Sequence, residues 1–368
     1  MDTRPSVVFL TLPPSLGGSV RALEAHVGAV EDMHRVLAAP LGTSAGAYLQ
    51  DTGLFDEEVD VRVHGRFRLA RALRAAAGFR RWAVANQDRI LAIHANGMPE
   101  MAVAWTAAAA LGVPLVVWAH GVEVPRFVRW LAPVWRRPTV DVRWAAVSHA
   151  AATKILASGV AVPDRMSVVP NPIDPAAVLA SHPHDSDTST LAFLGGGSTR
   201  KGFDMLAGLL EDLSDVPVRL LTAGSLPKDG DEHWEALLRH GDRVVTMGGL
   251  DDVREIYGAA DIVLMPSRQE SFGRVAAEAM MNGLPVVAFD IPALREVVGD
   301  GEGGLLVPLD DQVAFNGAVR SLIERPELRR RMAETGRARA EAFVPSRVSQ
   351  ALCRLYGPME PDEITQTG

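Results

Sequence analysis

Two glutamates, Glu270 and Glu278, lie eight residues apart in the stretch RQESFGRVAAEAMMNG, residues 268–283. An alanine-rich helix is predicted to begin near Phe272 or Gly273. The free N–H groups of its first turn, together with the helix dipole, favour an anion, and a glycine lets that anion approach the backbone closely. A carboxylate on each side of an anion suits a ligand with hydroxyls on both sides of a phosphate, such as a nucleotide diphospho-sugar.

The simpler alternative is that both glutamates are solvated and that Glu270 only favours the positive end of the helix dipole. The flanking sequence argues against it. An apolar run at 261–267 precedes the pair, and Asn282-Gly283 ends the helix before a second apolar run at 284–290. Because a strand, a helix and a strand follow one another here, the pair is predicted to lie at a strand–helix junction.

Short apolar, β-branched runs alternate with stretches of helical periodicity along the whole chain. The strands are predicted at 6–12, 59–65, 90–97, 114–121, 142–148, 190–196, 218–224, 243–249, 261–267 and 284–290. Such continuous apolar runs separated by helices are typical of parallel sheets covered on both faces.

Each half of the chain opens with a strand, a glycine turn and a helix, at Gly17-Gly18 and at Gly195-Gly196-Gly197. Two doubly wound α/β domains are therefore expected, at 1–177 and 178–344. A terminal helix at about 345–357 is expected to pack back onto the first domain.

The composition is that of an ordinary globular protein, with 48% hydrophobic and 22% charged residues in 368. Cys353 is the only cysteine, so a disulfide framework within the chain is excluded and a reducing compartment is expected. The first residues do not form a signal peptide pattern, and no apolar run is long enough to span a membrane. A cytoplasmic location, with peripheral contact at the inner face of the membrane as an option, is the expectation.

Arginine is concentrated in the first half, where residues 62–143 hold thirteen arginines against four acidic residues. Two stretches, 66–82 and 126–137, combine arginine with Phe, Leu or Trp, as in segments that bind anionic lipid. Leu73 and Phe79 are predicted to supply part of the apolar face of the first stretch. The alternative is a solvated helix. Nucleic-acid binding is not expected, because the net charge is −8 and no recognition motif of basic and aromatic residues occurs.

The run PSRQESFGRVAAEAMMNGLPVVAFDIPALREVV, residues 266–298, resembles the E-x7-E signature of retaining glycosyltransferase family four. The resemblance extends over nearly the full chain. It includes Gly17-Gly18, VVWAHG with His120, VSHAAATKIL at 147–156, VVPNPID at 168–174, LGGGSTRKGFD at 194–204 and LLTAG with Gly224.

The resemblance implies the GT-B fold, in which two Rossmann-like doubly wound domains face each other across a cleft. The implied activity is retaining transfer of a hexose-type sugar from a UDP- or GDP-sugar to a hydroxyl of a glycan, glycolipid or small molecule, without cofactor or metal. Glu270 would contact the donor sugar, Lys201 would neutralise the diphosphate, and His120 would lie beside the reacting sugar.

The resemblance also implies the donor-binding residues. Arg274 and Val275 would lie at the phosphate, Glu278 at the ribose, and residues 247–250 at the base. The full implied set is Gly17, Gly18, Gly196, Gly197, Gly224, Met247, Gly248, Leu250, Ser271, Phe272, Gly273, Arg274, Val275 and Glu278.

One position departs from the family pattern. Gly196 occupies the place where the family usually has an arginine that partners the lysine at the diphosphate. Arg200, beside Lys201, is predicted to supply the second cation, with weakened donor binding or a different donor as the alternative.

Other functions and residues are weighed against this interpretation. A nucleotide-sugar epimerase of the same fold and a non-catalytic sugar-nucleotide-binding homologue remain alternatives. Neither a G-x-G-x-x-G fingerprint nor a P-loop pattern occurs in 194–204, which argues against a dehydrogenase and a nucleoside triphosphatase. His94, in IHANG, is a candidate for lining the cleft, although buried histidines are common.

Overall fold

The computed structural model describes residues 4–13, 15–62, 68–174, 187–227, 230–249 and 253–357, with only the backbone for 68–71. The chain forms two compact units. Unit 1 comprises Met1–Pro172 and Pro345–Gly368, and unit 2 comprises Ile173–Val344. Unit 2 thus begins a few residues before the predicted boundary at 177/178.

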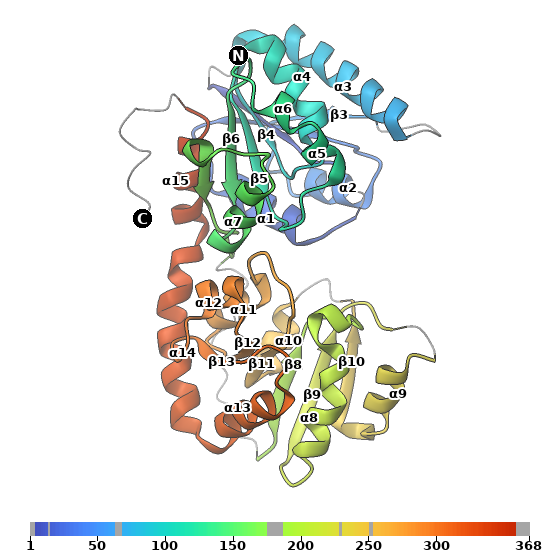
Figure 1. The fold of residues 1–368 in the computed structure, drawn as a ribbon, viewed down its shortest axis with the longest axis vertical. Coiled ribbons are helices and arrows are strands. Elements are labelled where there is room, and N and C mark those ends of the chain that lie inside the picture. The colour runs from blue at the N-terminus through green and yellow to red at the C-terminus, as the bar shows by residue number, and fades with distance from the viewer. Residues whose placement is uncertain are drawn as a thin grey trace. The chain divides into compact units, whose positions relative to one another are not determined.

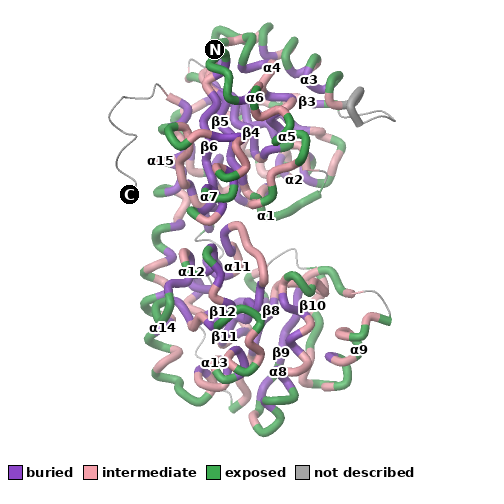
Figure 2. Tube along the Cα trace, viewed as in Figure 1, coloured by how far each residue is buried: buried purple, intermediate pink, exposed green. Residues whose placement is uncertain are grey.

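Unit 1 contains a seven-stranded parallel sheet with the order β3-β2-β1-β4-β5-β6-β7 (Figure 1). The strands are β1 Ser6–Leu10, β2 His34–Ala39, β3 Glu57–Asp60, β4 Ile90–Ala95, β5 Leu115–Ala119, β6 Val142–Ala146 and β7 Met166–Val168. Every residue of β1, β5 and β6 is buried, as expected for strands with helices on both faces. In the burial view the region around β4, β5 and β6 is drawn mostly as buried (Figure 2).

The helices of unit 1 follow its strands in alternation. They are α1 Gly18–Gly28, α2 Ser44–Asp51, α3 Arg68–Ala85, η1 Gln87–Arg89, α4 Met101–Leu111, α5 Arg126–Trp130, α6 Ala132–Trp135, α7 His149–Ala157, η2 Pro163–Arg165 and α15 Pro345–Arg354. Helix α15, from the end of the chain, packs against α1. There the buried His26 ring contacts the hydroxyls of Ser349 and Tyr356, each at 2.9 Å.

Unit 2 contains a six-stranded parallel sheet with the order β10-β9-β8-β11-β12-β13. The strands are β8 Ser189–Phe193, β9 Val218–Ala223, β10 Val244–Gly248, β11 Ile262–Met265, β12 Val286–Phe289 and β13 Gly304–Val307. Its helices are η4 Thr199–Lys201, η5 Phe203–Met205, α8 Leu206–Asp212, α9 Glu232–Leu238, η6 Gly241–Arg243, α10 Arg254–Ala259, α11 Arg274–Met281, α12 Pro292–Val298, α13 Gln312–Glu324, α14 Pro326–Ala340 and η7 Glu341–Phe343.

Both sheets reverse their strand order once, between β1 and β4 in unit 1 and between β8 and β11 in unit 2. In open α/β sheets, ligands bind outside the carboxyl ends of the strands at such a reversal. The loops after β1 and β4, and those after β8 and β11, are therefore the places where each unit is expected to hold a ligand.

Three strands were not predicted from the sequence. Strand β2 has the sequence HRVLAA, whose first two residues are polar, and β7 and β13 contain only three and four residues. The predicted strand at 59–65 is observed as β3, which ends at Asp60, and its last residues lie outside the described ranges.

Candidate functional site

The strand reversal of unit 2 carries an ion pair between Lys201 and Glu270. Lys201 ends the loop after β8, and Glu270 follows β11. The Lys201 Nζ atom lies 2.6 Å from Glu270 Oε1, and the two side chains are 28% and 10% exposed. The structure thus brings together, at the expected edge of the sheet, a cation that suits phosphate and a carboxylate that suits sugar hydroxyls.

Arg268 fixes the turn that carries Lys201. Its guanidinium binds both carboxylate oxygens of Asp204 at 2.8 Å and also donates to the Thr199 carbonyl, while its N–H donates to the Arg200 carbonyl at 2.9 Å. Burial acts to raise the pKa of Asp204, but the hydrogen bonds from Arg268 outweigh it and hold that pKa below its usual range. This role was not predicted from the sequence, although Arg268 lies within the signature stretch.

Arg200 itself is exposed, and its guanidinium makes no hydrogen bond or ion pair within the described part of the chain. Its assignment as the second diphosphate cation stays a prediction.

The glycines after β8 lie directly against the loop after β9. Gly196 has a φ of +56°, and a Cβ there would lie 2.7 Å from the Ser225 carbonyl oxygen. A Cβ at Gly197 would lie 2.3 Å from the Pro227 ring, and one at Gly224 would lie 2.8 Å from the Gly196 nitrogen. The backbone N–H of Gly196 donates to Ala223 O at 3.0 Å. The loops after β8 and β9 therefore pack backbone against backbone, and this conformation leaves no space for an arginine side chain at position 196.

Helix α11 begins at Arg274, directly after Gly273. Gly273 has a φ of +100°, and a Cβ at this position would lie 2.6 Å from the Leu294 side chain. Phe272 is buried edge-on against Phe343, with ring centroids 5.2 Å apart. Only the backbone of Phe272 is therefore available to a ligand, whereas Ser271 and Val275 are half-buried.

Glu278 is 6% exposed and receives two hydrogen bonds from its own unit. Arg274 Nε lies 2.6 Å from Oε1, and the Tyr257 hydroxyl donates to Oε2 at 2.8 Å. Burial raises the pKa of Tyr257 well above its usual range, and the Glu278 carboxylate raises it further, so Tyr257 remains a donor. Each carboxylate oxygen keeps a second lone pair for another hydroxyl. Tyr257 was not singled out in the sequence.

The segment predicted to hold the base, 247–250, begins in the last two residues of β10. Gly248 has a φ of +66°, and its carbonyl accepts the Gly224 N–H at 2.7 Å, whereas Met247 is half-buried. Leu250 lies outside the described residues.

His120 lies at the carboxyl end of β5 in unit 1. Its ring stacks at a tilt on Trp118, with centroids 4.5 Å apart. The ring nitrogens contact the side chains of Asn96 and Asn171, each at 2.9 Å. The loop after β1 lies at the same edge of the sheet and ends in Gly17 and Gly18. The Gly17 carbonyl accepts two N–H groups of α1, and Gly18 is the first residue of that helix.

The interpretation of His94 as a cleft-lining residue is wrong, because its side chain is completely buried. It lies instead beside the terminal segment, where Nδ1 contacts the Tyr356 hydroxyl at 2.8 Å. Burial lowers the pKa of His94 well below its usual range and that of His26 to about 3. Sequence spacing alone does not distinguish a strand-end histidine that faces the core from one that faces a ligand.

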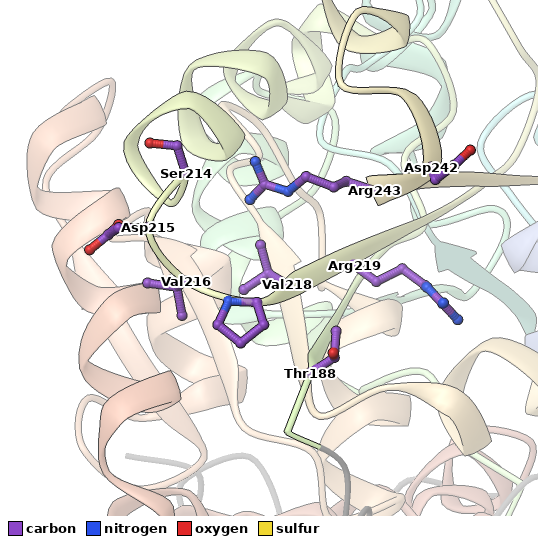
Figure 3. A pocket seen from close by; sticks show the side chains of 9 residues that line it. Thr188, Ser214, Asp215, Val216, Val218, Arg219, Asp242 and Arg243 are labelled. Carbon is purple, nitrogen blue, oxygen red and sulfur yellow. The ribbon is translucent and has the colours of Figure 1, made fainter.

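A shallow hollow of about 420 Å³ in unit 2 lies at the opposite edge of the sheet (Figure 3). Its lining residues include Thr188 and Pro217, which precede β8 and β9, and Arg243, which donates to the Leu210 and Leu213 carbonyls. Because it lies at the amino ends of the strands, it is separate from the Lys201–Glu270 pair.

No group of three or more His, Cys, Asp or Glu side chains able to hold a metal ion occurs in the described residues. In the same part of the chain, no helix is both long and apolar enough to cross a membrane.

Comparisons with known proteins agree on one family. Residues 17–177 match the sequence model of Glycosyltransferase Family 4, and residues 177–339 match that of Glycosyl transferases group 1. A phosphatidyl-myo-inositol mannosyltransferase of Mycobacterium leprae is 31% identical over 75% of this chain and 75% of its own length.

Two further proteins extend the comparison. A D-inositol 3-phosphate glycosyltransferase of Corynebacterium urealyticum is 33% identical over 47% of this chain, which spans only 44% of that relative. The crystal structure of HepE from Anabaena, in complex with UDP and glucose, superposes with a TM-score of 0.78 and 21% identity, covering 95% of this chain and 99% of that one. The predicted fold class is thereby confirmed.

Proposed function

The chain belongs to glycosyltransferase family 4 and has its GT-B fold, and on this premise we propose that it is a retaining, metal-independent transferase of sugar from a UDP- or GDP-sugar. The observation that supports the proposal best is the Lys201–Glu270 pair at the strand reversal of unit 2, 2.6 Å apart. Glu278, which is buried and follows Glu270 by eight residues, completes a site for a ligand with hydroxyls on both sides of a diphosphate.

In the proposed reaction, the bond between the sugar C1 and the β-phosphate oxygen breaks, and an acceptor oxygen forms a bond to C1 on the same face. The acceptor proton passes to the departing phosphate. Lys201 would leave Glu270 for the diphosphate and stabilise the negative charge that develops there. The loss of one such stabilising donor costs about 2.7–4 kcal/mol in measured cases. Glu270 would then accept hydrogen bonds from sugar hydroxyls.

We propose a phosphorylated inositol, free or in a lipid, as the acceptor class. The support is that both relatives described above carry inositol in their names, one as D-inositol 3-phosphate and one as phosphatidyl-myo-inositol. Unit 1 would bind this acceptor, with His120 beside the reacting sugar.

Donor binding is tested by thermal unfolding with a panel of UDP- and GDP-sugars. A ligand at 100 times its Kd stabilises the folded state by about 2.7 kcal/mol, which raises Tm by roughly 5–11 °C for a unit of this size. Glu278→Gln is expected to lose most of this shift. Asp242→Ala, at the opposite edge of the sheet, is the matched control and is expected to keep it.

The outcomes separate the candidate activities. Transfer to an added acceptor supports the transferase, isomerised donor would indicate an epimerase, and binding without turnover would indicate a non-catalytic homologue. A protein that no nucleotide sugar stabilises would contradict the proposal.

We also propose that unit 1 touches anionic membrane through residues 126–137. On α5, Val128 is buried, whereas Phe127 and Trp130, one helical turn apart, are 42% and 80% exposed. Four exposed arginines lie in the same stretch, at positions 126, 129, 136 and 137. Aromatic rings beside arginines suit a lipid interface, and each arginine near an anionic surface contributes about 1 kcal/mol.

The other basic stretch fits this role less well. Phe79 of α3 is only 2% exposed and stacks on Trp82, so its predicted contact with lipid is wrong. Leu73 is 62% exposed, and Phe67 lies outside the described residues.

The membrane proposal is tested by sedimentation with phosphatidylglycerol and phosphatidylcholine vesicles. Trp130→Ser is expected to weaken binding to the anionic vesicles, and the matched control Val313→Ser, 82% exposed in unit 2, is expected to leave it unchanged. Equal failure to bind both vesicles would refute the proposal.

A further inference from the structure

The His120 ring contacts a buried asparagine at each of its nitrogens, one from the loop after β4 and one from the loop after β7. Asn96, directly after β4, places Oδ1 2.9 Å from Nε2, and Asn171, after β7, places its side-chain oxygen 2.9 Å from Nδ1. The two asparagines are 2% and 7% exposed. Rotation of the His120 ring would break its contacts with two buried side chains.

The orientation of the Asn96 amide is determined by its other contacts. Its Nδ2 lies 3.2 Å from the Ser19 carbonyl oxygen and 3.3 Å from Thr11 Oγ1. Because a carbonyl oxygen can only accept, the amide nitrogen must face Ser19 and the amide oxygen must face His120. Nε2 of His120 must therefore carry a hydrogen.

We propose that Asn96 is a positioning residue, which keeps His120 in the Nε2–H form and ties its ring to the turn between β1 and α1. The importance of this positioning of His120 for catalysis rests on the proposed transferase function. Nδ1 is then the ring nitrogen whose protonation can change. The Asn171 amide, which has no second partner among the residues described, can present its nitrogen to a neutral Nδ1 or its oxygen to a protonated one.

A second contact fixes the same turn. Glu100, 2% exposed, accepts the Leu12 N–H at 3.0 Å through Oε1. Its Oε2 occupies the space where a Cβ at Gly97 would lie, 2.7 Å away. Burial raises the pKa of Glu100, because it disfavours the charged carboxylate. The loop after β4 therefore holds the turn with Gly17 and Gly18 at two points, and Asn96 connects this arrangement to His120.

The tautomer is measured directly by ¹⁵N NMR of histidine-labelled protein at pH 8.5, with the His120 signals assigned by loss in His120→Gln. The wild type is expected to show a protonated Nε2 and an unprotonated Nδ1. Asn96→Ala is expected to shift the ring toward a mixture of tautomers. Asn96→Asp keeps an acceptor for Nε2–H but loses the donor to Ser19, so it is expected to keep the tautomer while loosening the turn.

Kinetics provide the second measurement. Asn96→Ala is expected to lower kcat by about 10- to 100-fold, the cost of a misplaced catalytic group, with the donor KM nearly unchanged. Asn316→Ala is the matched control, because this buried asparagine lies in unit 2 and accepts a hydrogen bond from Gln312 at 2.7 Å. It is expected to change neither the tautomer nor kcat.

An Nδ1–H tautomer in the wild type, or an unchanged tautomer in Asn96→Ala, would overturn the proposal. A correct tautomer in a protein without transferase activity would refute the proposed function instead. The NMR measurement therefore tests the role of Asn96, and the activity measurement tests the proposed function, so that either proposal can fail without the other.

Discussion

Restoring the arginine of the family pattern, by Gly196→Arg, is expected to destabilise unit 2 rather than improve donor binding. Gly196 has a φ of +56°, and a Cβ there would lie 2.7 Å from Ser225 O and 3.0 Å from Ser225 N. Real Cβ atoms do not approach backbone atoms this closely, so one of the two loops must move.

Two costs determine the magnitude. A residue with a side chain in the left-handed region costs about 1–2 kcal/mol, and inserting atoms into a closely packed region costs about 1–3 kcal/mol. Together they amount to roughly 3 kcal/mol, which lowers Tm by about 6–12 °C for a unit of this size.

The assay is calorimetric or fluorescence-detected unfolding of Gly196→Arg, Gly196→Ala and Gly241→Ala. Gly241 is the matched control, because its φ is +57° but no atom lies within 4 Å of its Cβ position. Gly241→Ala is expected to show only the backbone cost, of about 1–2 kcal/mol. Gly196→Ala is expected to lose about as much stability as Gly196→Arg, since the conflict is already present at Cβ.

The reasoning would be refuted by a Gly196→Arg protein that is as stable as the wild type and binds the donor more tightly. An equal effect of alanine at 196 and 241 would also refute it, because the contact with Ser225 would then have no cost.

Three further predictions concern the sites described above. Lys201→Ala is expected to reduce kcat by about 100- to 1,000-fold, as when a fixed stabilising donor is removed, in a steady-state assay of nucleotide release; a loss below tenfold would contradict the assignment. Tyr257→Phe removes a hydrogen bond to a buried carboxylate and is expected to cost about 1.5–3 kcal/mol of stability, measured by urea unfolding, and an unchanged midpoint would contradict this. His26 has a pKa of about 3 when folded against 6.5 when unfolded, so the unfolded state binds more protons as the pH falls below 6.5. The contribution of His26 to stability is therefore complete above pH 6.5 and decreases by about 1.4 kcal/mol per pH unit toward pH 3. His26→Gln is expected to reduce the slope of stability against pH in this range, and an unchanged slope would contradict the role assigned to His26.

The fold was largely predictable from sequence because a buried parallel strand leaves a strong signal. Strands such as β5, LVVWA, are apolar at every position, and glycine turns follow the first strand of each unit. Strand β2 was missed because it begins with His34 and Arg35, and β7 was missed because it is only three residues long.

The carboxylates of the candidate site, Glu270 and Glu278, were predictable from residue type and spacing, whereas Lys201 was indicated only by the family resemblance. The meeting of Lys201 with Glu270 follows from the order of the strands, which places the loops after β8 and β11 side by side. The supporting contacts were not predictable, because Arg268–Asp204, Tyr257–Glu278 and Asn96–His120 join residues far apart in the chain. No periodicity in the sequence encodes such pairs.

The most direct test of the account is an NMR assay of transfer in the presence of EDTA, using UDP- and GDP-sugars with inositol 3-phosphate or phosphatidylinositol vesicles. A retaining, metal-independent transferase is expected to release one nucleoside diphosphate per glycosylated acceptor, to give the anomeric configuration of the donor, and to form no product with Lys201→Ala. An inverted product, a requirement for divalent metal, or the absence of transfer with every donor would contradict this proposal.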